Sequence, residues 1–363
     1  MKERITKVFQ KCEEKPDAII LKNPGESIVD LNFFYATGLE QGLFEGCIAV
    51  LRPDGDITII VSSLELELAK KADANILTYS NREEFNIHLK NSIQDCKKIG
   101  INHSVLPLYD FKKLVKILPD TSFLNVSDAF NNVRQVKDAS EIGNIREAVK
   151  IADRVMEKIP EILHEDMFEY ELAAEINYLL QKNGADTPAF DTISSFGKNT
   201  ALPHYTHGNS QLKASDFIIC DFGACFKRYN SDMTRTFVFG DTSEKHSMMY
   251  SIVQNAQKIA FENIKPGIKA KEVHIAVDDF INTSEMKGRF IHSTGHSLGL
   301  GVHDGGVGFN SECGIILEEG MVLTVEPGVY VPGFGGVRIE DDILVTKDGC
   351  ELLTKSNREL IQI

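Results

Sequence analysis

Residues 217–232 read FIICDFGACFKRYNSD, an apolar run that ends in a carboxylate and leads through a basic turn to a second carboxylate. The apolar residues are typical of a buried strand, and Asp221 follows them directly. Asp232 stands just before the β-branched run at 234–239, which predicts a second strand. In a hairpin of this length both carboxylates can point to the same face of neighbouring strands.

Two carboxylates held together in a core repel each other, so either one takes up a proton or a cation lies between them. The alternative is one buried aspartate, Asp221, with Asp232 solvated in the turn. The remaining motifs of the chain disfavour that alternative. The pair therefore predicts a cation site built on a sheet.

The composition narrows the classes of protein. At 363 residues the chain is long for one hydrophobic core, so we expect two domains. A net charge of −14 disfavours a nucleic-acid binder, which presents a basic face. No apolar run has the length of a membrane span, and the first residues lack the apolar core of a secretion signal. The seven cysteines form no C-x-x-C pair and are typical of reduced thiols. We expect a cytoplasmic protein with neither nucleic-acid nor membrane partners.

The first domain, residues 1–126, is predicted to be a small α/β domain. Its expected elements are a helix at 2–12, a strand at 18–21, a hairpin at 47–61, and helices at 64–71 and 83–96 that alternate with short apolar runs. This domain has no cluster of histidine and acidic residues that indicates a site. We expect it to make oligomer contacts and to close one side of a cleft.

The second domain, residues 127–363, repeats one order of elements. The expected elements are a helix that begins with a capping box at Asp138, further helices at 170–182, 243–263 and 270–285, the strands around Asp221, and a strand region at 289–292. Two helices followed by strands, twice over, predict two similar halves that face each other across one sheet.

Histidines gather where the two halves reach their strands: His204, His207, His292, His296 and His303. Glu326 and Glu340 each interrupt an apolar strand, in VEPG at 325–328 and VRIED at 337–341. A carboxylate inside an apolar strand costs several kcal/mol unless it is paired or bound to a cation. Four such carboxylates and a histidine suit two divalent cations of the Mn, Co, Fe or Zn kind. Two such ions activate a water for attack on a carbonyl, so the expected chemistry is hydrolysis.

These motifs resemble the signatures of the pita-bread metallopeptidases, and within them are most similar to Xaa-Pro dipeptidase (prolidase) and Xaa-Pro aminopeptidase. The resemblance rests on DFG at 221–223, YNSDMTRTF at 229–237, HSTGHSLGL at 292–300 and the two glutamate motifs. It covers the second domain closely and the first domain more weakly. The implied fold is an α+β pita-bread catalytic domain with pseudo-twofold helix-helix-strand halves, preceded by a smaller α/β creatinase-type N-terminal domain.

The resemblance implies five ligands for two divalent metal ions: Asp221, Asp232, His296, Glu326 and Glu340. Asp232 and Glu340 would bridge the ions. Asp221 would complete one ion, and His296 with Glu326 the other. Glu326 would also carry the proton of the attacking hydroxide.

Four further residues match substrate-binding or supporting positions of the family: His204, His292, His303 and Arg338. His204 would help to hold the substrate and the tetrahedral intermediate, and His303 would act at the reacting carbonyl and the leaving nitrogen. His292 and Arg338 would line the proline-side pocket or orient ligands. Thr234 is expected to orient Asp232 through a hydrogen bond.

The implied activity is hydrolysis of the bond between an N-terminal residue and proline, by a homodimer. Ser297 stands where glycine is usual after the ligand histidine and adds little bulk. The run at 205–207 after His204 resembles some aminopeptidases, so dipeptidase and aminopeptidase both stay open. A full N-terminal domain disfavours methionine aminopeptidase. The complete ligand set disfavours the metal-free creatinases and a non-catalytic peptide-binding member of the fold.

Overall fold

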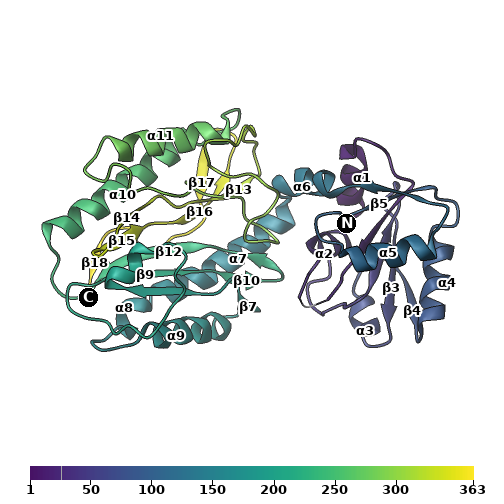
Figure 1. Cartoon of the computed structure of the whole chain (residues 1–363), viewed down its shortest axis with the longest axis horizontal. Coiled ribbons are helices and arrows are strands. Elements are labelled where there is room, and N and C mark those ends of the chain that lie inside the picture. The colour runs from purple at the N-terminus through teal and green to yellow at the C-terminus, as the bar shows by residue number, and fades with distance from the viewer. Residues whose placement is uncertain (26) are drawn as a thin grey trace. The chain divides into compact units, whose positions relative to one another are not determined.

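The computed structural model describes residues 1–25 and 27–363 and forms two compact units, Met1–Arg134 and Gln135–Ile363 (Figure 1). The sequence-based boundary between residues 126 and 127 falls directly before helix α6, which belongs with the first unit up to Arg134.

The first unit is built on a six-stranded sheet in the order β4-β3-β2-β1-β5-β6. Its strands are β1 (Ala18–Lys22), β2 (Ile48–Leu51), β3 (Ile57–Ser62), β4 (Asn75–Tyr79), β5 (Lys98–Ile101) and β6 (Ser122–Asn125). Its helices are α1 (Lys2–Lys11), α2 (Leu31–Thr37), α3 (Leu66–Ala69), α4 (Arg82–Ser92), α5 (Leu108–Ile117) and α6 (Ser127–Gln135). The predicted hairpin is confirmed, because β2 runs antiparallel to β3. The remaining described pairs of this sheet, apart from β1 with β2, are parallel.

The second unit has four small sheets, ordered β11-β10-β7, β18-β12-β9-β8, β13-β16-β17 and β14-β15. The strands of its first half are β7 (Thr187–Pro188), β8 (Ile193–Phe196), β9 (Phe217–Phe222), β10 (Ala224–Phe226), β11 (Tyr229–Asn230) and β12 (Met233–Val238). The later strands are β13 (Val322–Val325), β14 (Gly328–Val331), β15 (Gly335–Arg338), β16 (Asp341–Val345), β17 (Cys350–Leu352) and β18 (Ile361–Gln362).

The helices of the second unit are α7 (Ala139–Met156), α8 (Ile159–Ile162), α9 (Glu169–Lys182), α10 (Glu244–Asn263) and α11 (Ala270–Asn282), with a 3₁₀ turn at Gly197–Ala201. The capping box predicted at Asp138 is present, since its side chain accepts from the amides of Ser140 and Glu141 and Glu141 accepts from the Asp138 amide. These contacts satisfy amides that a helix N-terminus otherwise leaves unpaired.

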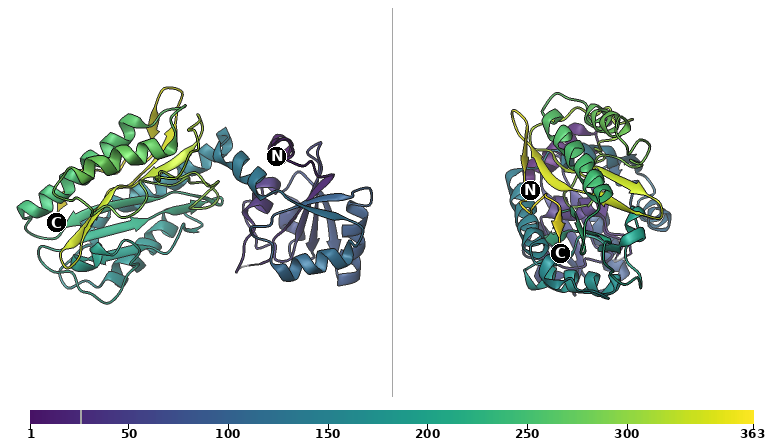
Figure 2. Two further views of the ribbon diagram at one scale, coloured as in Figure 1. Left: turned by 45° about the horizontal axis from the view of Figure 1, so that its top comes forward. Right: turned by 90° about the vertical axis from the view of Figure 1, so that its left-hand side faces the viewer.

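The strands of the second unit lie between two layers of helices. Helices α10 and α11 cover one side, and α8 and α9 cover the other (Figure 1, Figure 2). One core joins α7 and α9 to β9 and β12, and another joins α10 and α11 to β13, β14, β15 and β16. The repeated order of elements in the sequence therefore corresponds to two halves, each with its own apolar core.

The two halves meet beside β12 through one backbone hydrogen bond and one side-chain hydrogen bond. The Glu340 amide donates to the Thr234 carbonyl at 3.1 Å, and the Thr236 hydroxyl donates to the Arg338 carbonyl at 2.8 Å. This junction places residues 338–340 of the second half next to the strand that follows Asp232.

Two expected elements differ in the structure. The strand region predicted at 289–292 is irregular. Its backbone accepts one hydrogen bond, from Tyr330 to Arg289, while the Phe290 and His292 rings pack edge to face at 5.1 Å. The helix predicted at 64–71 is the single turn α3, and Leu64 is 91% exposed. In both places side-chain hydrophobicity alone suggested a longer regular element.

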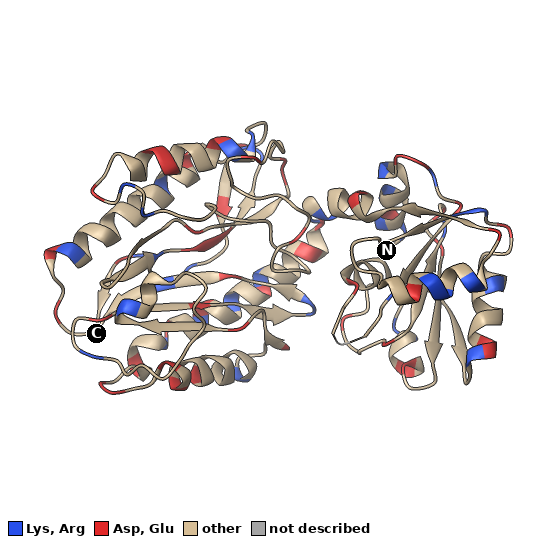
Figure 3. Ribbon diagram, viewed as in Figure 1, with Lys and Arg blue, Asp and Glu red and all other residues tan. Residues whose placement is uncertain are grey.

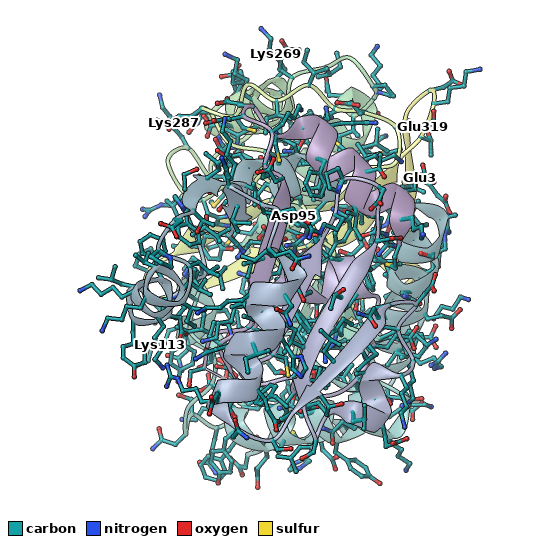
Figure 4. The ribbon with its side chains drawn as sticks, turned by 90° about the vertical axis from the view of Figure 1, so that its right-hand side faces the viewer. Glu3, Asp95, Lys113, Lys269, Lys287 and Glu319 are labelled. Atoms are coloured by element: carbon teal, nitrogen blue, oxygen red, sulfur yellow. The ribbon has the colours of Figure 1, made fainter. Side chains whose placement is uncertain are left out.

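Charged side chains of the second unit such as Lys269, Lys287 and Glu319 extend from its surface (Figure 4). Acidic residues also lie on its central strands, where they are enclosed between the helix layers (Figure 3). None of the helices in the described part of the chain combines the length and apolarity needed to cross a bilayer.

Candidate metal centre

The first two carboxylates of the centre come from adjacent strands. Asp221 lies in β9, directly opposite Thr234 of the antiparallel β12, and Asp232 lies just before β12 begins. Between the two strands the chain forms the short pair β10 and β11, which turns at Lys227 and Arg228 with positive φ angles of 49° and 69°. Asp221 and Asp232 are both buried, and both line one cavity of about 720 Å³. The predicted convergence of this pair is confirmed.

The second half supplies two glutamates at strand ends. Glu326 follows β13, and Glu340 lies between β15 and β16. Residues 294–298 run beside β13, with backbone bonds from Thr324 to His296 at 2.8 Å and from Leu298 to Val322 at 3.0 Å. These bonds bring His296 to the same edge of the cavity as Glu326.

His296 lies close to carboxylates from both halves. Its Nε2 atom lies 3.6 Å from Oδ2 of Asp232 and 3.6 Å from Oε1 of Glu326. Asp232, His296 and Glu340 each offer one ligand atom, and these three atoms lie within 4.8 Å of one another. Such a cluster of imidazole and carboxylate donors has the composition of a divalent transition-metal site.

The carboxylates are crowded in a medium of low polarity. Burial, followed by repulsion from Glu340 and Asp221, raises the pKa of Asp232, and burial and Glu326 raise that of Glu340. Burial, with a contribution from the Asp221 charge, raises the pKa of Glu326 to about 8. The Oδ1 atom of Asp221 is buried without a hydrogen-bond partner among the described residues. A group of positive charge in this cavity would relieve both the repulsion and the unpaired oxygen, so the residues present fit divalent cations.

The imidazole of His296 is suited to act as a neutral donor. Burial and the neighbouring His303 lower the pKa of His296 to about 4. Its Nδ1 atom lies 3.3 Å from the Ser297 carbonyl, a contact that requires the proton on Nδ1. The lone pair of Nε2 then faces Asp232 and Glu326.

Arg338 lies at the base of the centre and contacts it from three directions. Its guanidinium pairs with Oδ2 of Asp221 and donates to the Tyr330 hydroxyl at 2.9 Å. Its Nε donates to the Thr234 hydroxyl at 3.1 Å, and that hydroxyl donates to Oε2 of Glu340 at 2.6 Å. The expectation that Thr234 orients Asp232 is therefore wrong. Thr234 sits opposite Asp221 in the ladder, so its hydroxyl reaches across the junction to Glu340.

The remaining predicted residues also line the cavity: His204, His292 and His303. The rings of His303 and His296 lie 4.2 Å apart at 71°. Burial and the Arg338 charge lower the pKa of His292 to about 4, and its Nε2 lies 2.8 Å from the Tyr330 hydroxyl. His207 instead faces the Thr192 carbonyl at 3.2 Å. Sequence reasoning missed Tyr330. The one signal that could have indicated it is its hydroxyl group, which stands in a short apolar strand.

Comparison with known proteins identifies the family. The model of metallopeptidase family M24 matches residues 143–347, and that of the creatinase/prolidase N-terminal domain matches residues 4–136. The chain belongs to metallopeptidase family M24. It is a metal-dependent hydrolase, and the predicted pita-bread fold with a creatinase-type N-terminal domain is confirmed.

Similar proteins match over the full length. An Xaa-Pro dipeptidase of Pyrococcus horikoshii is 38% identical over 99% of both chains. The structure of an Xaa-Pro dipeptidase from Bacillus anthracis has a TM-score of 0.91 at 31% identity, covering 100% of this chain and 99% of that one. The structure of an X-Pro aminopeptidase from Thermotoga maritima has a TM-score of 0.90 at 30% identity, covering 96% of this chain and 98% of that one.

Proposed function

We propose that this metallopeptidase is an Xaa-Pro dipeptidase, which hydrolyses the bond between an N-terminal residue and proline. The observation that carries the proposal is the cluster of buried Asp232 and Glu340 with half-buried His296 in one cavity. The same cavity also contains His204, His292 and His303. The 38% identity to a dipeptidase over 99% of both chains supports the choice of substrate.

The centre would hold two divalent ions, Mn, Co, Zn or Fe, through five side chains: Asp221, Asp232, His296, Glu326 and Glu340. The ligand atoms of Asp232, His296 and Glu340 lie within 4.8 Å of one another, which supports their binding to a common ion. Bound divalent ions supply Lewis acidity and lower the pKa of a water in the site.

The protein's own residues would handle the proton and the substrate. The proline nitrogen of the scissile bond carries no N–H, so it needs a proton before it can leave. Glu326 would carry that proton, since its carboxylate lines the cavity beside His296. His303 would face the reacting carbonyl, and His204 would help to hold the substrate, since both line the cavity near the carboxylates.

His292 and Arg338 would shape the proline side of the cavity. Both contact the Tyr330 hydroxyl, which fixes the two side chains relative to each other. Because Arg338 also pairs with Asp221, this arrangement would couple the substrate pocket to the metal ligands.

A second candidate is Xaa-Pro aminopeptidase, which acts on longer peptides. The likeness to the Thermotoga maritima aminopeptidase, with a TM-score of 0.90, favours it, as does the tyrosine that follows His204. A non-catalytic peptide-binding role is a weaker candidate, because the described chain retains all five predicted ligands in one cavity.

The protein would act as a homodimer in the cytoplasm. The seven cysteines are free thiols, which supports a reducing compartment. Light scattering on the purified protein tests the oligomeric state, and a mass of one chain would contradict the dimer.

The test of this function compares the rates at which the protein hydrolyses an Xaa-Pro dipeptide and a longer Xaa-Pro-Yaa peptide. Both assays contain Mn²⁺ or Co²⁺, and Glu340→Ala is the control. Cleavage of the dipeptide alone supports the dipeptidase. Efficient cleavage of the longer peptide would make the protein an aminopeptidase. Cleavage of neither by metal-loaded protein would overturn the substrate class.

A further inference from the structure

The loop at residues 197–208 carries His204 into the cavity, yet the His204 ring makes no hydrogen bond to the described residues. The contacts of the loop on either side of His204 therefore bear directly on its position. On one side of His204, the Pro203 carbonyl accepts from Nη1 of Arg338 at 3.4 Å. On the other side of His204 lies Tyr205, whose hydroxyl donates a hydrogen bond to the buried carboxylate of Glu169.

Glu169 is the first residue of α9 and is 0% exposed. Its Oε1 accepts from the Phe196 amide at 2.8 Å and from the Asn199 side chain at 2.9 Å. Its Oε2 accepts from the Tyr205 hydroxyl at 2.8 Å and from the Gly208 amide at 3.0 Å. Four donors that span the whole loop thus converge on one carboxylate.

Hydrogen bonds offset the cost of burying a carboxylate, and each charge-assisted bond is stronger than a neutral one. The N-terminal position in α9 adds favourable interaction with the helix dipole. Burial and the bond to Glu169 raise the pKa of Tyr205 to about 12, so its hydroxyl remains a donor at neutral pH. The Glu169 carboxylate therefore fixes the ends of the loop, because displacing it would leave four hydrogen-bond donors unpaired.

The packing of the loop is equally restrictive. A Cβ atom added to Gly208 would lie 2.1 Å from the Tyr205 hydroxyl, so the loop closes directly over the bond between Tyr205 and Glu169. Asn199 bridges the same region, because its amide also contacts the Ser210 hydroxyl at 2.9 Å.

We propose that Glu169 is a positioning residue for His204: it holds the loop at 197–208 so that the imidazole faces the substrate. The proposal rests on the role given above to His204 in peptide hydrolysis. Glu169 lines no part of the cavity and acts only through the loop.

Glu169→Gln is the direct test. It replaces one carboxylate oxygen with an NH₂ group, which cannot accept hydrogen bonds from the two donors that face it. Misplacement of a substrate-holding group lowers kcat/KM by roughly ten- to a hundredfold, and we expect a loss of that size. Tyr205→Phe removes one of the four bonds and should cost about three- to tenfold. Glu171→Gln is the matched control, since Glu171 lies in the same helix turn and accepts from the Phe168 amide, outside the loop.

A double-mutant cycle separates positioning from general loosening of the fold. If Glu169 acts through His204, Glu169→Gln should cost less than about twofold in a His204→Ala background. An equal loss in both backgrounds would overturn the proposal.

Histidine NMR of the Zn²⁺-loaded protein gives a readout that does not depend on activity. Of the ten histidines, the His204 resonance should shift in Glu169→Gln and in Tyr205→Phe, while the His296 and His303 resonances stay in place. An unchanged His204 resonance in both variants would contradict the proposal, even if the wild-type protein failed to cleave Xaa-Pro peptides. If the wild-type protein failed to cleave these peptides but the His204 resonance still shifted in both variants, the proposed function would be wrong and the anchoring role of Glu169 would stand.

Discussion

Nε2 of His296 lies 3.6 Å from Oδ2 of Asp232, although the two residues come from opposite halves of the second unit. The contact exists because residues 294–298 pair with β13, β13 pairs with β16, and Glu340, which precedes β16, is hydrogen-bonded to Thr234 of β12 next to Asp232. The centre is thus shared by both halves. Changes to either half should therefore alter metal binding.

Metal binding should strengthen as the pH rises. Burial raises the pKa of Glu326 to about 8, and burial with mutual repulsion raises those of Asp232 and Glu340. Unfolded carboxyls titrate near pH ~4, so between about pH 4 and 8 the folded metal-free protein binds more protons than the unfolded chain. Its stability therefore falls as the pH rises through this window.

A cation must displace those protons, so the increase in Tm on adding Mn²⁺ should be larger at pH 8 than at pH 5.5. Thermal melts with and without Mn²⁺ across this range measure it. An increase in Tm that is constant with pH would contradict protonated carboxylates in the metal-free site.

Thr234→Val should weaken metal binding by roughly ten- to a hundredfold, because it removes the hydroxyl that links Arg338 to Glu340. Thr37→Val is the control. Thr37 is also buried, but its hydroxyl donates to the Phe33 carbonyl within α2 of the first unit. Isothermal titration with Mn²⁺ measures both affinities. Equal losses in the two variants would mean that burial of a hydroxyl, and not its contact with Glu340, matters.

Tyr330→Phe should lower kcat/KM for an Xaa-Pro dipeptide by about tenfold, because it frees His292 and Arg338 from their shared hydroxyl. Tyr250→Phe is a matched change, since that buried hydroxyl donates to the Arg358 carbonyl at 3.0 Å, away from the cavity. Each variant should lose about 1 kcal/mol of unfolding free energy. Full activity in Tyr330→Phe would rule out a role for this hydroxyl.

Arg235→Leu should destabilise the fold by about 3–5 kcal/mol, because it leaves the Asp341 carboxylate buried without its cation. Both side chains of this pair are nearly inaccessible, at 2% and 1%. Arg146→Leu breaks a pair with Glu351 whose side chains are each 39% exposed, and should cost less than about 1 kcal/mol. Urea unfolding compares the two. Similar losses would show that burial does not decide the strength of these pairs.

The sequence was most informative where a residue contradicts its surroundings. Asp221, Glu326 and Glu340 interrupt apolar strands. Because burying a charge without a partner is costly, this pattern alone indicates that the carboxylates bind a partner. The paired halves followed from the repeated helix order. The hydroxyl contacts of Thr234 and Tyr330 could not be predicted, because threonine and tyrosine are ordinary strand residues and their partners lie more than a hundred residues or one hairpin away.

The same limit explains Glu169 and the irregular segment at 289–292. A glutamate at the start of a helix has an ordinary local explanation, and its four loop partners appear only in the folded chain. At 289–292 the local apolar pattern predicts a strand, but the segment instead packs its rings against Tyr330 and His274.

Titration of the metal-free protein with Mn²⁺, while cleavage of an Xaa-Pro dipeptide is followed, tests most directly whether this centre is a two-metal peptidase site. We expect no cleavage before metal is added, a rise in rate that saturates at two equivalents, and no rise in Glu340→Ala. Cleavage by metal-free protein, or none at any Mn²⁺ or Co²⁺ concentration, would contradict a two-metal peptidase site.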